Sequence, residues 1–133
     1  MHPEPMFQGM IVPKSTLLDI GLLDEKVPAY QEWDTSIRLA KDHELIHMEE
    51  PLFYYNIHDG ETISKSSKKD ILGYEYVIEK NKKNIVKLWG YGGLLERYKL
   101  LLKKSMQYKS RKVYKYIAKW YLAKLLHKVK EES

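Results

Sequence analysis

The chain contains no cysteine, so disulfide bonds and metal sites built on thiolate ligands are both excluded. No apolar run approaches the roughly 20 residues that a membrane-spanning helix needs. The amino terminus also lacks the basic-then-apolar pattern of a secretory signal. These absences predict a reducing, cytoplasmic setting. An Asp-x-Asp pair, which is typical of divalent metal sites with oxygen ligands, is missing as well.

What the chain does contain is a folded domain's share of apolar residues and an uneven distribution of charge. Its 133 residues are 44% hydrophobic and 31% charged, which predicts one soluble core of ordinary size. Residues 1–65 carry 5 Lys and Arg against 12 Asp and Glu, whereas residues 66–133 carry 18 against 6. We therefore expect two parts with different roles, an acidic front at 1–65 and a basic rear at 66–133.

Three segments of the acidic front have the composition of short β-strands. They are "MIVP" at 10–13, "HELIHM" at 43–48 and "PLFYYNIH" at 51–58, all rich in apolar or aromatic residues. So few short strands form a marginal sheet by themselves. The predicted fold class is therefore α/β (α+β within this chain), with the front as the last part of a larger α/β domain.

Two helices are expected between these strands. The first covers "KSTLLDIG" at 14–21, with Ser15 or Thr16 as its amino-terminal cap and Gly21 as its left-handed end. The second covers "QEWDTSIRLA" at 31–40, where Trp33, Ile37 and Ala40 form one apolar stripe.

The basic rear predicts three or four helices and no strand. Apolar residues recur at helical spacing from 70 to 89, "GYGG" at 90–93 interrupts the pattern, and residues 94–104 continue it. A last helix is expected at 110–130, with Val113, Ile117, Trp120 and Leu125 near one face and lysines around the rest.

The acidic front resembles a known enzyme family over residues 9–64. A glycine and a short strand come first, followed by a helix ending in "IG", the turn "LDE", the run "EWD", then "RLA" and a strand pair ending "YNIH". This order is similar to the C-terminal half of the catalytic domain of family 2 glycosyltransferases, which have a nucleotide-diphospho-sugar transferase fold of the GT-A type.

The resemblance implies transfer of a sugar, with inversion, from a nucleotide-diphospho-sugar donor to a hydroxyl of a glycan or lipid-linked acceptor, as in polysaccharide and cell-envelope biosynthesis. The family's catalytic base is the acid that precedes the aromatic residue, and this position is Glu32. The family usually has Asp there, and a further acid where this chain has Gln31. A carboxylate in this place would take the proton of the attacking hydroxyl.

The resemblance also implies the remaining site residues. Those on the sugar and acceptor side are Gly9, Met10, Trp33, Asp34 and Arg38, and His58 corresponds to a histidine that reaches the metal or the diphosphate in some members. The family's Mg²⁺ or Mn²⁺ would be held mostly by residues outside this chain. We therefore expect a truncated or split part of an enzyme that is inactive alone.

Each of these positions also has a purely structural interpretation. Glu32 is the kind of acid that favours the first turn of any helix, Asp34 can pair with Arg38 on the surface, and Trp33 can belong to the core. His58 can be an ordinary polar residue at a strand end.

The basic rear leaves its partner open. It can pack back on the enzyme or bind an anionic membrane surface peripherally, whereas nucleic acid is a weaker alternative because no recognised motif appears. Self-association through an exposed strand edge is a further alternative. The rival to the enzyme hypothesis is a small non-catalytic module whose basic helices bind anionic membrane or a partner protein.

Overall fold

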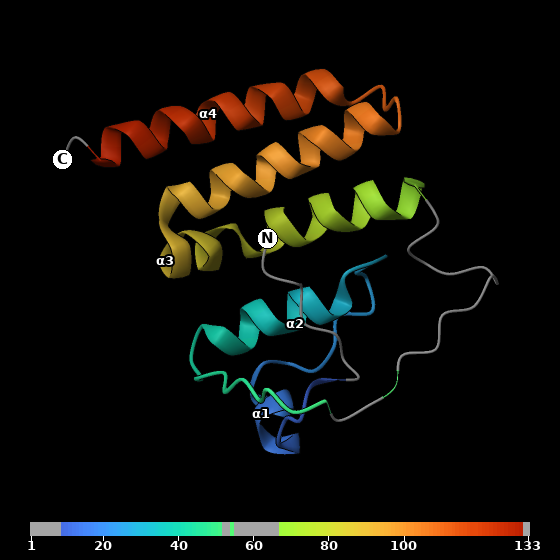
Figure 1. Ribbon diagram of the computed structural model, residues 1–133, viewed down its shortest axis with the longest axis vertical. Helices are drawn as coiled ribbons and strands as arrows, with labels where there is room; N and C mark the ends of the chain where they lie inside the picture. The colour runs from blue at the N-terminus through green and yellow to red at the C-terminus, as the bar shows by residue number, and fades with distance from the viewer. Residues whose placement is uncertain (1–8, 52–53, 55–66, 132–133) are drawn as a thin grey trace.

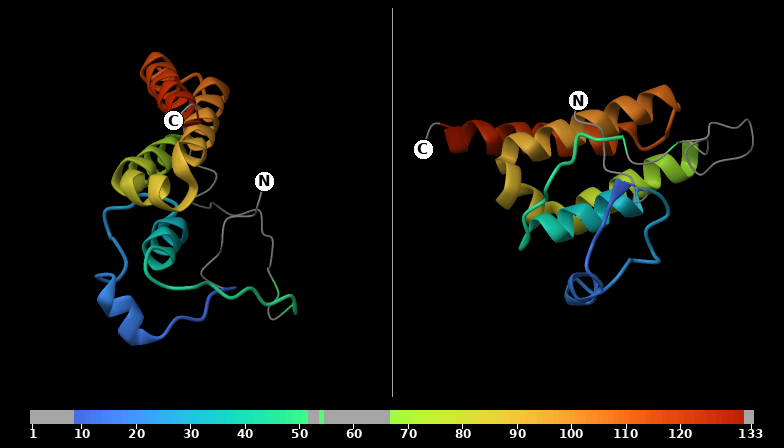
Figure 2. Two further views of the ribbon diagram at one scale, coloured as in Figure 1. Left: turned by 90° about the vertical axis from the view of Figure 1, so that its left-hand side faces the viewer. Right: turned by 60° about the horizontal axis from the view of Figure 1, so that its bottom comes forward.

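The computed structural model describes residues 9–51, 54 and 67–131, coloured in Figure 1. These residues form four helices and no strand: α1 (Lys14–Asp19), α2 (Gln31–Ala40), α3 (Ser67–Gln107) and α4 (Val113–Glu131). In the views of Figures 1 and 2, α4 lies at one edge of the molecule and α1 near the opposite edge. No helix in the described ranges is both long and apolar enough to cross a membrane.

Helix α3 is bent into two antiparallel arms at Gly90. The backbone of Gly90 has φ 66° and ψ −173°, which is not helical, and this divides α3 into an arm at 67–89 and an arm at 91–107. The Tyr98 hydroxyl donates a 2.9 Å hydrogen bond to Glu79, and Lys104 lies 3.0 Å from Asp70. The first pair lies closer to Gly90 in both arms and the second pair lies farther from it, so the two arms run in opposite directions. The break predicted at 90–93 is confirmed.

Helix α4 packs beside both arms of α3 (Figure 1). Its Tyr116 hydroxyl donates a 2.8 Å hydrogen bond to Glu75, and its Lys119 donates a 2.7 Å bond to Glu79. The inner face is formed by Tyr116 and Ala123, both fully buried. Leu125 differs from the three residues predicted to share its face, because its side chain is 61% exposed whereas Val113, Ile117 and Trp120 are half-buried.

The acidic front and the basic rear share one hydrophobic core. Trp33 of α2 stacks on Tyr74 of α3 with ring centroids 4.9 Å apart, and Val27 and Ile37 belong to the same cluster. Arg97 of the second arm lies over the Trp33 ring at 5.6 Å, a cation–π contact. Helix α2 therefore fixes the front to the rear.

The predicted α/β fold class is wrong for the described residues, which contain no strand. Residues 43–48 are irregular and lack a hydrogen-bonded ladder, and Leu45, Ile46 and Met48 are 54% to 88% exposed. Residues 10–13 likewise form no ladder, and Ile11 is 91% exposed. A strand needs a neighbour that supplies N–H and C=O partners, and an apolar sequence pattern cannot supply one. The third predicted strand, 51–58, lies mostly outside the described residues.

The short helix at 14–21 is confirmed as α1, with one correction at its start. Pro13 is the N-cap residue, and no side chain caps the helix, so the prediction of a Ser15 or Thr16 cap is wrong. Gly21 has φ 79°, and its N–H bonds the carbonyl of Leu18, so the predicted left-handed end is confirmed.

Candidate functional site at the start of helix α2

The start of α2 is held in place by the rear of the molecule. Its N-cap residue, Tyr30, has a left-handed backbone with φ 70° and ψ 34°. The Tyr30 hydroxyl donates a hydrogen bond to Asp70 and accepts one of 2.9 Å from Lys104. Left-handed backbone is unfavourable for a bulky residue, so these contacts with α3 must stabilise it. The first turn that follows carries Glu32 and Asp34, and its orientation is thereby fixed.

Asp34 is the buried centre of a polar network. Its carboxylate accepts hydrogen bonds from Arg38 Nε at 2.9 Å, Lys80 Nζ at 2.9 Å and Asn81 Nδ2 at 2.7 Å. The side chain is 1% exposed. The predicted pair with Arg38 therefore forms, but its expected place on the surface is wrong. A buried carboxylate is tolerated only when it is paired and hydrogen-bonded, and this one is.

The network continues from α2 to the turn at 20–26. Arg38 Nη1 donates 2.7 Å hydrogen bonds to the carbonyls of Ile20 and Leu22. Lys80 also bonds Asp24 at 2.7 Å. Hydrogen bonds from Lys80 and from the backbone N–H of Lys26 lower the pKa of Asp24 to about 2. Asp34, Arg38 and Lys80 therefore hold the turn at 20–26 against both α2 and α3, and we call these three residues the clamp.

Glu32 differs from Asp34 in having no such partner. It is half-buried, and its carboxylate makes no hydrogen bond or ion pair with any residue that the structure describes. Ser36 lies one turn later on the same face, and its hydroxyl contacts the Met10 sulfur at 3.7 Å. Of the two acids beside the tryptophan, Asp34 is fully hydrogen-bonded within the fold, whereas the Glu32 carboxylate is not bonded by any described residue.

The structure divides the predicted site residues into two groups. Met10 lies beside the Glu32 face of α2, and the neighbouring Gly9 is exposed. Trp33 is 4% exposed and belongs to the core, while Asp34 and Arg38 belong to the clamp. The Nη2 atom of Arg38 is buried and has no hydrogen-bond partner within the described part of the chain. His58 lies outside the described residues.

Sequence reasoning missed the partners that α3 supplies to this site. Lys80 and Asn81 lie 46 and 47 positions from Asp34, and Lys104 lies 74 positions from Tyr30. The spacing within α2 predicted only the local partner, Arg38. No signal in the sequence around 80–81 distinguishes these residues from the many other polar residues of the rear.

The described residues offer no ligand set for the divalent metal that the resemblance implies. Within ranges 9–51, 54 and 67–131, no group of three or more histidine or acidic side chains could hold a metal ion. Asp24 and Asp34 both face one cation, the ammonium of Lys80, which already occupies the place between the two carboxylates where a metal would have to bind. These residues do not fit a metal.

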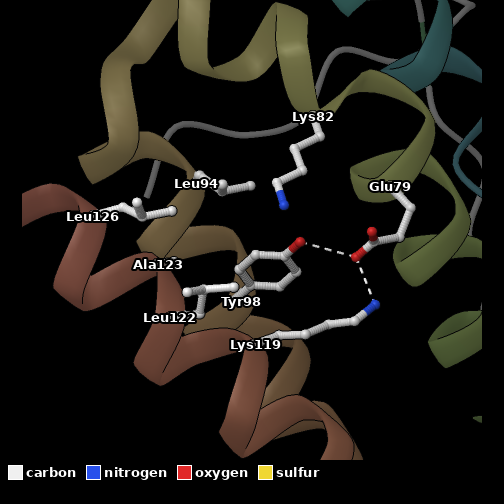
Figure 3. Close-up of a pocket in the computed structure, with 8 residues that line it drawn as sticks. All are labelled: Glu79, Lys82, Leu94, Tyr98, Lys119, Leu122, Ala123 and Leu126. Carbon is white, nitrogen blue, oxygen red and sulfur yellow. Dashed lines mark hydrogen bonds and ion pairs between the residues drawn. The ribbon is translucent and has the colours of Figure 1, made fainter.

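A small hollow lies between the arms of α3 and α4 (Figure 3). Its volume is about 170 Å³, below the roughly 300 Å³ at which ligand pockets begin. Figure 3 shows the carboxylate of Glu79 joined to both Tyr98 and Lys119, so these three polar side chains already pair with one another, and Lys82 is the remaining polar residue of the lining. Burial and the bond to Glu79 raise the pKa of Tyr98 well above its usual range. This hollow is a packing feature of the bundle.

Comparison with known proteins assigns neither a family nor a function to this chain. No protein-family model matches the chain, and no curated protein or solved structure matches it either.

Proposed function

We propose that this chain forms part of the catalytic region of an inverting glycosyltransferase, with Glu32 as the general base. The observation that carries the proposal is the contrast between the two acids of "EWD". Asp34 is buried with three hydrogen-bonded partners, whereas Glu32, one turn before the Ser36 that contacts Met10, has no partner in the described part of the chain. A base must be free to approach a substrate hydroxyl, and only Glu32 meets this condition.

The surroundings of Glu32 support the same role. The fixed position of Tyr30 and the clamp around Asp34 hold the first turn of α2 rigidly, which a positioned base requires. The Glu32 carboxylate would accept the proton of the acceptor hydroxyl as that oxygen attacks the anomeric carbon and the nucleotide diphosphate departs. Such proton transfer contributes about 10²–10⁴ in rate.

The uncovered apolar side chains of the front agree with a larger catalytic region. Ile11, Leu45, Ile46 and Met48 flank the α2 region in segments without regular structure, and all are at least half exposed. Exposed apolar clusters mark surfaces that another part of a protein covers. We propose that the donor site and the metal site lie on the part that covers them, together with the acceptor cleft facing Glu32.

The test is Glu32→Gln in the enzyme that contains this chain, with Asp34→Asn as its matched control. Glu32→Gln is expected to keep the melting temperature and the affinity for the sugar nucleotide while lowering kcat by at least 100-fold. Asp34→Asn is expected to lower the melting temperature, because it weakens the clamp. Near-normal turnover by the Glu32→Gln enzyme would reject the assignment.

A second candidate function is non-catalytic binding by the basic rear. It is favoured by the composition of residues 97–130, which contain 12 Lys and Arg and no Asp or Glu. This candidate predicts that Glu32→Gln changes nothing, whereas neutralising lysines of α4 abolishes binding to an anionic partner. The two functions are therefore distinguished by which substitution abolishes function: Glu32→Gln in the front, or neutralised lysines in α4.

A further inference from the structure

The outer face of α4 carries an apolar stripe that no described residue covers. Its large residues are 56% to 84% exposed. They recur in steps of three and four, so they fall on one side of the helix. The stripe consists of Tyr114, Ala118, Tyr121, Leu125 and Val129, and Leu122 lies at its edge, where it also lines the hollow of Figure 3.

This stripe lies opposite the face that packs into the bundle. Tyr116 and Ala123, which are buried against α3, are separated from the stripe by about half a helical turn. Helix α4 is the outermost helix of the bundle in both Figure 1 and Figure 2. The stripe therefore faces away from the molecule, along a helix of 19 residues.

Positive charge borders the stripe without any acid between residues 97 and 130. Lys124 is exposed on one border and Lys115 on the other, and Lys130 follows at the end of the helix. A helix with an apolar face, lysines beside it and aromatic rings on that face is typical of helices that lie in a membrane interface. Tyrosine suits this position because its ring is apolar and its hydroxyl stays hydrated.

We propose that α4 docks by its outer stripe on an anionic lipid surface, lying in the plane of the headgroups. Charge decides between the occupants of this face. A second copy packed by the same face would bring two lysine-rich helices together, each with a single acid, Glu131, at its last position, and like charges repel. An anionic lipid surface complements the lysines and accepts the apolar residues at the same time. This inference is independent of the chemistry proposed for Glu32.

The experiment measures binding of the full chain to vesicles by co-sedimentation. Vesicles of phosphatidylcholine with about one third phosphatidylglycerol are compared with pure phosphatidylcholine, each at low and high salt. We expect binding to the anionic vesicles only, weakened by salt because surface charge is screened. Lys124→Gln is expected to lower the affinity roughly fivefold, which corresponds to one lysine near an anionic surface.

The stripe is tested by the double variant Tyr121→Gln/Leu125→Gln, whose two positions are 56% and 61% exposed. It is expected to lower the affinity for anionic vesicles at least tenfold while leaving the circular dichroism spectrum unchanged. The matched control is Leu18→Gln/Leu45→Gln, at positions 54% and 55% exposed and outside α4. The control is expected to bind as the wild type does.

Four results would overturn the proposal. The first is no binding to anionic vesicles at low salt, and the second is equal binding by the stripe variant. The third is a wild-type dimer in sedimentation velocity that becomes a monomer in the stripe variant, with no binding of the wild type to vesicles. The stripe would then be the interface with a second copy. Binding to single-stranded RNA in place of vesicles, retained by the stripe variant, would likewise reject it.

Discussion

The carboxylate of Asp34 in α2 accepts a 2.7 Å hydrogen bond from the side-chain amide of Asn81 in α3, and both side chains are buried. The two residues lie 47 positions apart, one in the acidic front and one in the basic rear. Lys80, the neighbour of Asn81, bonds the other oxygen of the same carboxylate. This pairing joins the two parts of the chain by polar contacts beside their shared apolar core.

Replacing Asp34 with alanine is expected to destabilise the protein by about 3–5 kcal/mol, because Arg38 and Lys80 lose a buried counter-charge. Urea unfolding followed by circular dichroism measures the change. The control is Asp42→Ala, which removes a carboxylate that pairs with Lys41 on the surface and should cost less than about 1 kcal/mol. Equal costs for the two variants would show that the clamp contributes no more than a surface ion pair.

Stability is expected to fall as the pH drops from about 4 towards 2. The pKa of Asp24 is about 2 in the folded protein, against an ordinary value of 3.8. The unfolded chain therefore takes up a proton in this window before the folded protein does, and folding loses free energy as the pH falls. Since Asp24 is partly exposed, its contribution at neutral pH should be about 1–2 kcal/mol.

The variants Asp24→Asn and Lys80→Met test the origin of this pH dependence. Each is expected to make the free energy of unfolding less steep between pH 4 and pH 2, because the two residues form one pair. The double variant should flatten the curve little more than either single variant does. Additive effects would mean that Lys80 does not set the pKa of Asp24.

The helices could be predicted from the sequence because their signal is local. Ile71, Tyr74, Ile78, Ile85 and Leu88 recur at helical spacing, and the first four are buried while Leu88 is half-buried. The break at Gly90 was predicted for the same reason. Helix α4 shows the limit of this method, since it has apolar residues on two opposite sides. The spacing could not tell that Leu125 belongs to the outer one.

Neither the lack of strands in the described residues nor the clamp could be predicted, because both depend on distant parts of the chain. Residues 43–48 have the composition of a strand, but a ladder requires a second segment in register. A surface pair was one of two interpretations of Asp34, because Arg38 four residues later is a sufficient local partner. Only the packing of α3 over α2 brings Lys80 and Asn81 to the same carboxylate.

Substituting Gly73 by alanine is expected to destabilise the protein by about 1–3 kcal/mol, although alanine is the better helix former. A Cβ atom at Gly73 would lie 2.8 Å from both the Cβ and the carbonyl oxygen of Ala29, and backbone cannot easily move aside. Gly92→Ala is the matched control in the other arm of α3. Its Cβ would meet only the His127 ring, at 3.1 Å.

Because the His127 side chain is partly exposed and can turn, Gly92→Ala should be neutral or should stabilise the protein by up to about 1 kcal/mol. Thermal unfolding of the two variants measures the difference. A Gly73→Ala protein that melts at or above the wild-type temperature would show that α3 and the segment before α2 approach less closely at Ala29 than the structure describes.

Glu75 holds α4 against the first arm of α3, so Glu75→Ala is expected to loosen α4 selectively. Its carboxylate bonds Lys115 and the Tyr116 hydroxyl. Burial alone would raise the pKa of Glu75, but these bonds outweigh it and the pKa lies below its ordinary value. Removing the acid leaves the buried Tyr116 hydroxyl without its acceptor, at a cost of about 1–3 kcal/mol.

Hydrogen exchange resolved by residue is the decisive measurement for Glu75→Ala. Amides of α4 should exchange faster than in the wild type, while those of α2 keep their protection, since α2 depends on the clamp at Asp34. Glu96→Ala is the control, because Glu96 makes only an exposed pair with Lys99. Uniformly faster exchange throughout the chain would indicate that α4 and the α2–α3 unit unfold together, and that Glu75 stabilises the whole protein instead of one docked helix.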